Sequence, residues 1–381
     1  MPKRIPITPS VLKWARERSG FSIQEMTDRY KFYGEWESGD SYPTYNQLEQ
    51  LSDKFKCPIV VFFFPEPPEL EPIEKSFRTL PEIEFEYMPP MVRMQIRKAK
   101  AMQLNLIELH EGINPSRNFI IRDLDLDLKK STNELASEVR DYLQIPLKEQ
   151  VDWHNHYEAF DNWRNLLTTH GVYVFKDAFR ANGYSGICLY HDQFPLIYVN
   201  NSTAITRQIF TLFHELAHLL FHTSGIDKEN DNYIDILRNN ERRIEIFCNE
   251  FAGKFLVPDT DFTESIIGLK INEQNISSLA NKYKVSREVI LRKYLDRNMV
   301  SSQLYREKVA VWMEENNKSK GEGGNYYYTQ ITYLGHPYID LALTKYHQNR
   351  FDALQLSDYL NIQPKFLEKF EETYNSLTSN E

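Results

Sequence analysis

The sequence predicts an α+β fold in which a small β-sheet packs on one central helix, with helical domains at the amino- and carboxy-terminal ends. Residues 184–201 alternate apolar and polar side chains around Asp192-Gln193, which is typical of a β-hairpin. Residues 209–221 are apolar apart from a short cluster of charged and polar side chains, which indicates a buried helix with one functional face. Helical periodicity is found at 92–111, 133–143 and 157–169 before this centre and at 241–252 after it.

The central helix carries the motif His214-Glu215-Leu216-Ala217-His218. Because residues four apart share a face of a helix, both imidazoles can reach one metal ion, with Glu215 beside it. Zinc suits these ligands, since neutral imidazole binds it at about 2.0–2.1 Å and a catalytic zinc site keeps one position for water. We therefore expect His214 and His218 to bind Zn²⁺ and Glu215 to be the catalytic base. The alternative is a core helix whose histidines bond to their neighbours, which leaves Glu215 buried and unpaired.

The same helix carries a polar stripe that extends beyond the motif. The stripe repeats at steps of four and three residues through Arg207, Thr211, His214, His218 and His222. Since the other faces are apolar, the stripe must be buried, and buried polar groups need partners. The spacing of His222 does not suit a third histidine ligand. We expect His222 and Tyr184 to support the site, with help to a developing oxyanion as one possible role.

A third metal ligand is expected from the helix at 241–252. One face of this helix holds Glu241, Glu245, Cys248 and Ala252. Glu245 has small residues on its side of the helix and can approach the motif helix closely, whereas Glu250 points away. Cys248 is the alternative, as a thiolate ligand.

These segments resemble the ImmA/IrrE family of zinc metallopeptidases. Members carry H-E-x-x-H, then E-x-x-A-N-x-F-A, then L-x-P. The corresponding residues are Glu245-Ile246-Phe247-Cys248-Asn249-Glu250-Phe251-Ala252 and Leu256-Val257-Pro258, with Cys248 in place of the usual alanine. The resemblance is closest over 163–258. It implies a zincin-like metallopeptidase core in which His214, His218 and Glu245 bind zinc and Glu215 activates water. In zincin-like proteases an edge strand, here within the 184–201 hairpin, accepts the substrate backbone by strand addition.

The chain of 381 residues is long enough for several domains. We expect a helix-turn-helix-like domain at 1–66, a Pro-rich linker at 67–90, a helical connector at 91–150, the zincin-like core at 151–270 and a helical carboxy-terminal region at 271–381.

Composition indicates an ordinary soluble protein, with 41% hydrophobic and 26% charged residues. Three scattered cysteines suit a reducing cytoplasm, and the first residues lack the apolar segment of a signal peptide. The apolar run at 59–64 is too short to span a bilayer, so we expect a cytoplasmic protein without a membrane partner. The net charge of −9 argues against strong generic binding of nucleic acid.

Residues 1–66 resemble a helix-turn-helix of the Xre/Cro type. Ser22 and Glu25 form a predicted capping box, and Trp36-Glu37-Ser38-Gly39 follows in the expected order. Between Ser22 and Trp36 the chain is about four residues shorter than the usual spacing, so we expect a clipped recognition helix. Lys31 and Tyr33 are then the available DNA contacts. Nine Lys/Arg are matched by nine Asp/Glu, so there is no basic excess to hold phosphates. We expect a docking surface for a partner or a second copy, with DNA binding as the alternative.

A second helix-turn-helix-like element is predicted at 276–288, and its neighbouring cations Arg287, Arg292 and Lys293 could reach phosphates. We expect this element to serve packing instead.

The sequence thus favours a cytoplasmic zinc endopeptidase with a narrow protein substrate, a regulator or a toxin. One alternative is a DNA-binding repressor or antitoxin in which the zincin fold senses or scaffolds. Another is a partner-binding protein with vestigial metal chemistry, against which the intact set of His214, Glu215, His218 and Glu245 argues.

Overall fold

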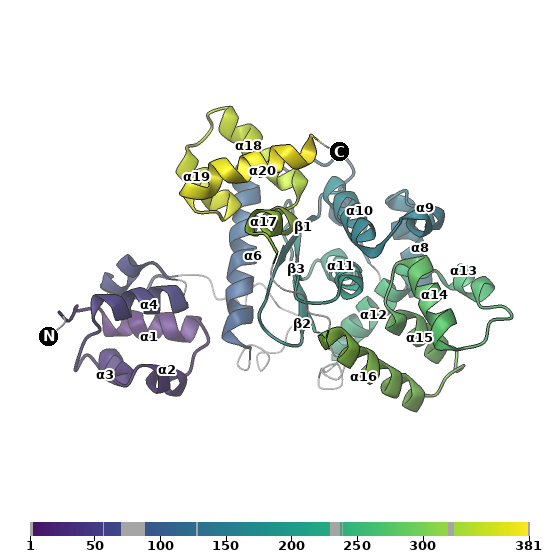
Figure 1. Ribbon diagram of the computed structural model, residues 1–381, viewed down its shortest axis with the longest axis horizontal. Helices are drawn as coiled ribbons and strands as arrows, with labels where there is room; N and C mark the ends of the chain where they lie inside the picture. Colours follow the sequence, from purple (N-terminus) through teal and green to yellow (C-terminus); the bar gives the residue numbers. More distant parts are fainter. Residues whose placement is uncertain are drawn as a thin grey trace. The chain divides into compact units, whose positions relative to one another are not determined.

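The chain divides into two compact units in the computed structural model, Met1–Lys98 and Ala99–Glu381 (Figure 1). The structure describes residues 3–55, 57–69, 88–126, 129–228, 237, 239–318 and 324–379. Most of the Pro-rich linker predicted at 67–90 lies outside these residues. No helix in the described ranges is long and apolar enough to cross a membrane.

The amino-terminal unit is helical. Its elements are α1 (Pro9–Arg18), α2 (Ile23–Arg29), α3 (Tyr33–Ser38), α4 (Tyr45–Phe55), the 3₁₀ helix η1 (Ile59–Phe63) and the first half of α6 (Pro90–Leu109). The capping box is confirmed: Glu25 N–H donates to Ser22 Oγ at 3.2 Å, and Ser22 N–H donates to Glu25 Oε2 at 2.7 Å. Gly39 ends α3 in the left-handed region, with φ of 86°.

The short helix α3 turns its aromatic side chains inward. Tyr33 and Trp36 are both fully buried, and the Tyr33 ring packs edge-on against those of Trp36 and Phe55. Tyr33 is therefore not at the surface, which differs from its expected place as a DNA contact. Burial of an aromatic ring in the core lowers the free energy of the folded unit more than exposure of that ring on a six-residue helix would. Lys31 is exposed, and the helix-turn-helix interpretation stays a prediction.

A four-stranded sheet lies at the centre of the second unit. Its strands are β1 (Tyr173–Asp177), β2 (Tyr184–Leu189), β3 (Leu196–Asn200) and β4 (Gly225–Lys228), in the spatial order β1-β3-β2-β4. The predicted hairpin is confirmed, because β2 and β3 pair antiparallel. Its expected place at an edge is wrong: β3 also pairs with β1 in parallel, and β2 also pairs with β4. The edge strands are β1 and β4.

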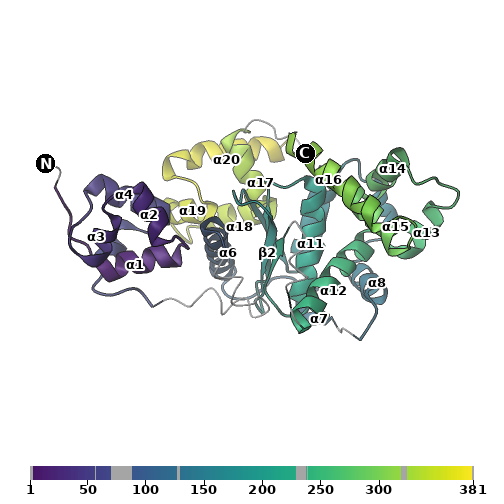
Figure 2. The ribbon, with the colours of Figure 1, turned by 90° about the horizontal axis from the view of Figure 1, so that it is seen from below.

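Helices cover both faces of this sheet. The helices that follow α6 in this unit are α7 (Ile120–Asp123), α8 (Thr132–Tyr142), α9 (Leu147–Asp152), α10 (His156–Thr169), α11 (Ile205–Leu220), α12 (Asn239–Leu256), α13 (Asp259–Ser265), α14 (Glu273–Tyr283), α15 (Arg287–Asp296), α16 (Ser302–Lys318), α17 (Tyr326–Leu334), α18 (His336–His347), α19 (Ala353–Leu360), η4 (Pro364–Phe366) and α20 (Leu367–Thr378). Of these helices, α10, α11 and α17 pack against the strands. The motif helix α11 lies between the sheet and α12, as Figure 2 shows. On the opposite face, the Tyr338 ring of α18 packs edge-on against Phe175 of β1 at 5.1 Å.

One large hydrophobic core joins α11 to its surroundings. Phe213 of α11 stacks on Phe255 of α12 with ring centres 4.1 Å apart, and Trp163 of α10 packs edge-on against Phe213 at 4.8 Å. The same core includes residues from Phe119 to Trp312. Rings of this size contribute several kcal/mol each when truncated, about 3–5, so they fix α11 firmly against α12.

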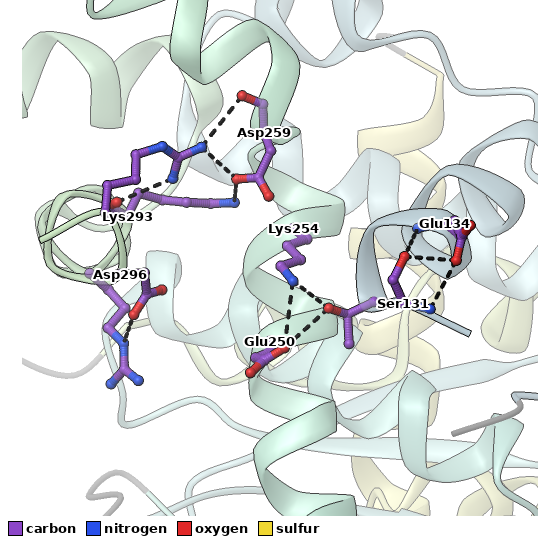
Figure 3. Close-up of polar contacts among 10 residues, drawn as sticks. Ser131, Glu134, Glu250, Lys254, Asp259, Lys293 and Asp296 are labelled. Carbon is purple, nitrogen blue, oxygen red and sulfur yellow. Dashed lines mark hydrogen bonds and ion pairs between the residues drawn. The ribbon is translucent and has the colours of Figure 1, made fainter. Parts of the chain in front are cut away.

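The helix pair α14–α15 belongs to this core. Ile276, Tyr283, Ile290 and Leu291 are buried in it. Its cations are paired within the chain: Lys293 and Arg297 both bond to Asp259 at the start of α13, at 3.0 and 2.8 Å (Figure 3). Arg287 pairs with Glu273 and Glu315. These contacts favour the packing interpretation of this element over contact with phosphates.

Polar contacts tie α12 to α8. Thr132, the first residue of α8, donates to Glu250 Oε2 at 3.1 Å and accepts from Lys254 Nζ (Figure 3). Glu250 therefore faces α8, whereas Glu245 faces the histidines of α11, so Glu250 points away from the Glu245 face as predicted.

Candidate metal centre

The two motif histidines and Glu245 converge between α11 and α12. His214 Nε2 lies 3.2 Å from His218 Nε2. Glu245 Oε1 lies 3.2 Å from His218 Nε2, and Glu245 Oε2 lies 3.5 Å from His214 Nε2. Both histidines are fully buried, and Glu245 is 4% exposed. In the described part of the chain these residues make the only group of three or more His, Cys, Asp or Glu side chains that could hold a metal ion.

The spacing of these atoms fits one tetrahedrally coordinated ion. Ligands about 2.0–2.1 Å from such an ion lie roughly 3.3–3.4 Å from one another. The two imidazole nitrogens are 3.2 Å apart, and each lies 3.2 or 3.5 Å from a different oxygen of Glu245, so these separations are close to that value. One ligand atom from each of the three residues lies within 4.8 Å of the other two. Two nitrogen atoms and a carboxylate also form the donor set that a catalytic zinc site uses. The residues therefore fit a metal ion.

Asn249 supports the first of these histidines. It lies one turn after Glu245 on α12, and its Oδ1 is 3.0 Å from His214 Nδ1. An acceptor at Nδ1 keeps the proton there and leaves the lone pair of Nε2 for a metal. The sequence carried a signal for this role, since Asn249 follows Glu245 by four residues on the same helical face. His218 Nδ1 is buried and has no hydrogen-bond partner among the described residues.

The charges in the centre favour a cation. Burial disfavours the imidazolium form of His214, but the carboxylates of Asp227, Glu245 and Glu215 outweigh burial and raise its pKa to about 9. Burial acts against the Glu245 carboxylate as well, yet His218 and His214 hold its pKa well below the usual range. Positive charge is thus stabilised at the point where the three ligand atoms meet, and a divalent ion supplies such charge.

Glu215 lies beside the histidines and contacts strand β4 of the sheet. Its Oε1 accepts a hydrogen bond from the backbone N–H of Asp227 in β4 at 2.9 Å. Its Oε2 is buried and has no partner among the described residues. Burial raises the pKa of Glu215, although His218 and His214 oppose that effect. The result is a buried carboxylate whose Oε1 is fixed by the β4 backbone and which has the Cys188 thiol beside it.

Two glycines allow α11 to approach the sheet this closely. A Cβ atom at Gly225 would lie 2.8 Å from Cγ and Cδ2 of His218 and 3.1 Å from Glu215 Oε2. A Cβ atom at Gly186 would lie 2.4 Å from Thr211 Cγ2. Real contacts are not that short, so the sheet touches the motif residues only because these positions lack side chains.

The other predicted site residues are not members of the metal-binding group. Cys248 is buried but outside the metal-binding group, and burial raises the pKa of its thiol well above the usual value, which disfavours a thiolate ligand. His222 contacts Asp125 at 3.2 Å and the Ile121 carbonyl at 3.3 Å, and its side chain is 44% exposed. Tyr184 begins β2, where its carbonyl accepts a hydrogen bond from Asn200 Nδ2 at 2.7 Å.

Comparison with known proteins finds a family model that is similar to part of the chain. Residues 167–294 match the peptidase M78 family, described as the IrrE N-terminal-like domain. The matched segment runs from the end of α10 through the sheet, α11 and α12 to α15. It supports the resemblance to the ImmA/IrrE family and a function of the metallopeptidase type. No curated protein matches the chain.

The close approach at Gly225 can be tested by substitution. Gly225→Ala would force a methyl group against the His218 ring, which α11 and the core hold in place, so we expect a loss of about 1–3 kcal/mol in the free energy of unfolding. Urea denaturation measures this loss. Gly253→Ala is the matched control, because Gly253 is helical and has open space around its Cβ position. Alanine there should leave stability unchanged or raise it by up to about 1 kcal/mol. Equal stability of both variants would contradict the packing described.

Proposed function

We propose that this protein is a cytoplasmic zinc-dependent endopeptidase that cleaves one specific protein partner, a regulator or a toxin. The observation that carries this proposal is the convergence of three buried metal-binding side chains beside the buried carboxylate of Glu215. The peptidase M78 match over the same elements supports it. The three cysteines are free, in keeping with a reducing compartment.

His214, His218 and Glu245 would hold the zinc ion. When bound, zinc polarises a peptide carbonyl and lowers the pKa of water toward about 7. Asn249 orients His214, and the stacked Phe213 and Phe255 keep α11 at its distance from α12.

Glu215 would act as the general base and then the general acid. Its free Oε2 accepts a proton from water as the water oxygen bonds to the peptide carbonyl carbon. The same carboxyl group then donates that proton to the amide nitrogen as the carbon–nitrogen bond breaks. A raised pKa suits both steps, because the group must bind and release a proton near neutral pH.

Burial of the centre supports a narrow substrate range. None of the four residues is more than 4% exposed, so a chain must be recognised before its backbone reaches the site. The alternative function, a DNA-binding repressor or antitoxin in which the zincin fold senses or scaffolds, has less support. Tyr33 is buried, and residues 1–66 have no net positive charge.

Metal analysis tests the ligand assignment. We expect the wild-type protein, purified without an affinity tag, to contain one zinc ion per chain and His218→Ala to lose it, because two ligands do not form a tight site. His222→Ala is the matched control, since His222 lies one turn further along the chain and outside the ligand group. Retention of tightly bound zinc by His218→Ala would rule out the assignment.

The role of the base is tested by Glu215→Gln, which keeps the shape of the side chain and removes its capacity to take a proton. We expect this variant to keep zinc and to lose about 10²–10⁴-fold in the rate of peptide cleavage. A proteome-derived peptide library, together with the proteins encoded next to this gene, provides substrates for mass spectrometry. The exposed Glu264→Gln should cleave as the wild type does. Undiminished cleavage by Glu215→Gln would exclude the mechanism, and no cleavage by the wild type would favour the repressor alternative.

A further inference from the structure

The pairing of β2 with β4 contains an irregularity directly beside the metal centre. Tyr184 is opposite Lys228 and Gly186 is opposite Asp227, so Ser185 is an extra residue in β2. Such a bulge redirects a side chain and interrupts the ladder. Ser185 is fully buried, and its Oγ accepts a hydrogen bond from Arg207 Nε of α11 at 2.9 Å.

The same arginine holds the end of β4. Arg207 Nη2 donates to Asp227 Oδ1 at 2.7 Å and to the Lys228 carbonyl at 2.8 Å. Thr211 Oγ1 donates to the other carboxylate oxygen, Asp227 Oδ2, at 2.7 Å. Asp227 is 1% exposed, so both of its oxygens are held by charge-assisted bonds away from water. The first two turns of α11 therefore fix one residue of the edge strand by its side chain.

The backbone of that residue holds Glu215. The Asp227 N–H donates to Glu215 Oε1 at 2.9 Å, while Glu215 Oε2 has no partner in the described ranges. Arg207, Thr211 and Glu215 follow one another at intervals of four residues and so lie along one face of α11. Hydrogen bonds thus lead from Arg207 and Thr211 of α11 to the Asp227 side chain, and from the Asp227 backbone back to the Glu215 carboxylate of α11.

We propose that Arg207, Thr211 and Asp227 are positioning residues, which fix Glu215 Oε1 through the β4 backbone and leave Oε2 as the oxygen that takes the proton. None of the three belongs to the metal-binding group. The proposal rests on the proposed role of Glu215 as the base. The polar stripe on α11 thus has two parts: Arg207 and Thr211 position the base, and His214 and His218 are the proposed metal ligands.

Two substitutions at Thr211 separate positioning from packing. Thr211→Val keeps the side-chain shape and removes the donor to Asp227, whereas Thr211→Ser keeps the hydroxyl group. We expect Thr211→Val to lower kcat by about 10- to 100-fold on the library peptide that the wild type cleaves fastest, with KM and bound zinc unchanged. Thr211→Ser should restore kcat. Thr168→Val, which removes a threonine hydroxyl bond within α10, is the control for loss of a helical hydroxyl.

A readout without catalysis is the amide resonance of Asp227 in protein labelled with [¹⁵N]aspartate, assigned by its loss in Asp227→Asn. In Thr211→Val and in Arg207→Met this resonance should move toward its position in Glu215→Ala, where the acceptor is missing. Thr211→Ser should leave it in place. An unmoved resonance in both variants overturns the proposal, as does a moved resonance with unchanged kcat. If the wild type cleaves nothing, the endopeptidase proposal fails, and the resonance alone still decides whether the network holds Glu215.

Discussion

The candidate metal centre depends on one packing constraint, the close fit of α11 between the sheet and α12. The stacked rings of Phe213 and Phe255 set the distance between α11 and α12. The lack of side chains at Gly186 and Gly225 sets the distance between α11 and the sheet. The two imidazole nitrogens and the Glu245 carboxylate, from two helices, come within 3.2–3.5 Å of one another only if both distances hold together. Protein interiors are close-packed, so a methyl group added on the sheet side shifts the ligands rather than filling a void.

This packing concentrates charge away from water. Glu215, Asp227 and Glu245 are all nearly or fully buried, and two imidazoles lie among them. An isolated buried carboxylate is strongly disfavoured, so each one here has a compensating partner. Hydrogen bonds from Arg207 and Thr211 offset the cost of burying the Asp227 carboxylate. The backbone N–H of Asp227 does the same for Glu215, and the two histidines do so for Glu245. His214, His218 and Glu245 form a group that could hold a metal ion, and such an ion would complete this arrangement.

The parts of the fold that were predictable are those with strong local signals. The helical motif placed His214, Glu215 and His218 on one buried helix, and the alternation at 184–201 predicted the β2–β3 hairpin. Glu245 was predicted as a ligand because small residues on its side of α12 allow a close approach to the motif helix. Residue types at fixed spacing within one element were sufficient for these features.

The features that escaped prediction depend on contacts between distant elements. Strand β4 has four residues, too few for a periodic pattern, so Asp227 carried no signal despite its contacts with α11. The parallel pairing of β1 with β3 places the hairpin inside the sheet, and strand order is not encoded in either strand alone. Tyr33 looked like a surface residue because its helix is short, yet tertiary packing buries its ring.

Anomalous diffraction at the zinc absorption edge, from crystals of the untreated wild-type protein, tests the central claim most directly. The account predicts a single peak about 2.0–2.2 Å from His214 Nε2, His218 Nε2 and a carboxylate oxygen of Glu245. Zinc found elsewhere on the chain, or no peak at this point in zinc-supplied crystals, would contradict it.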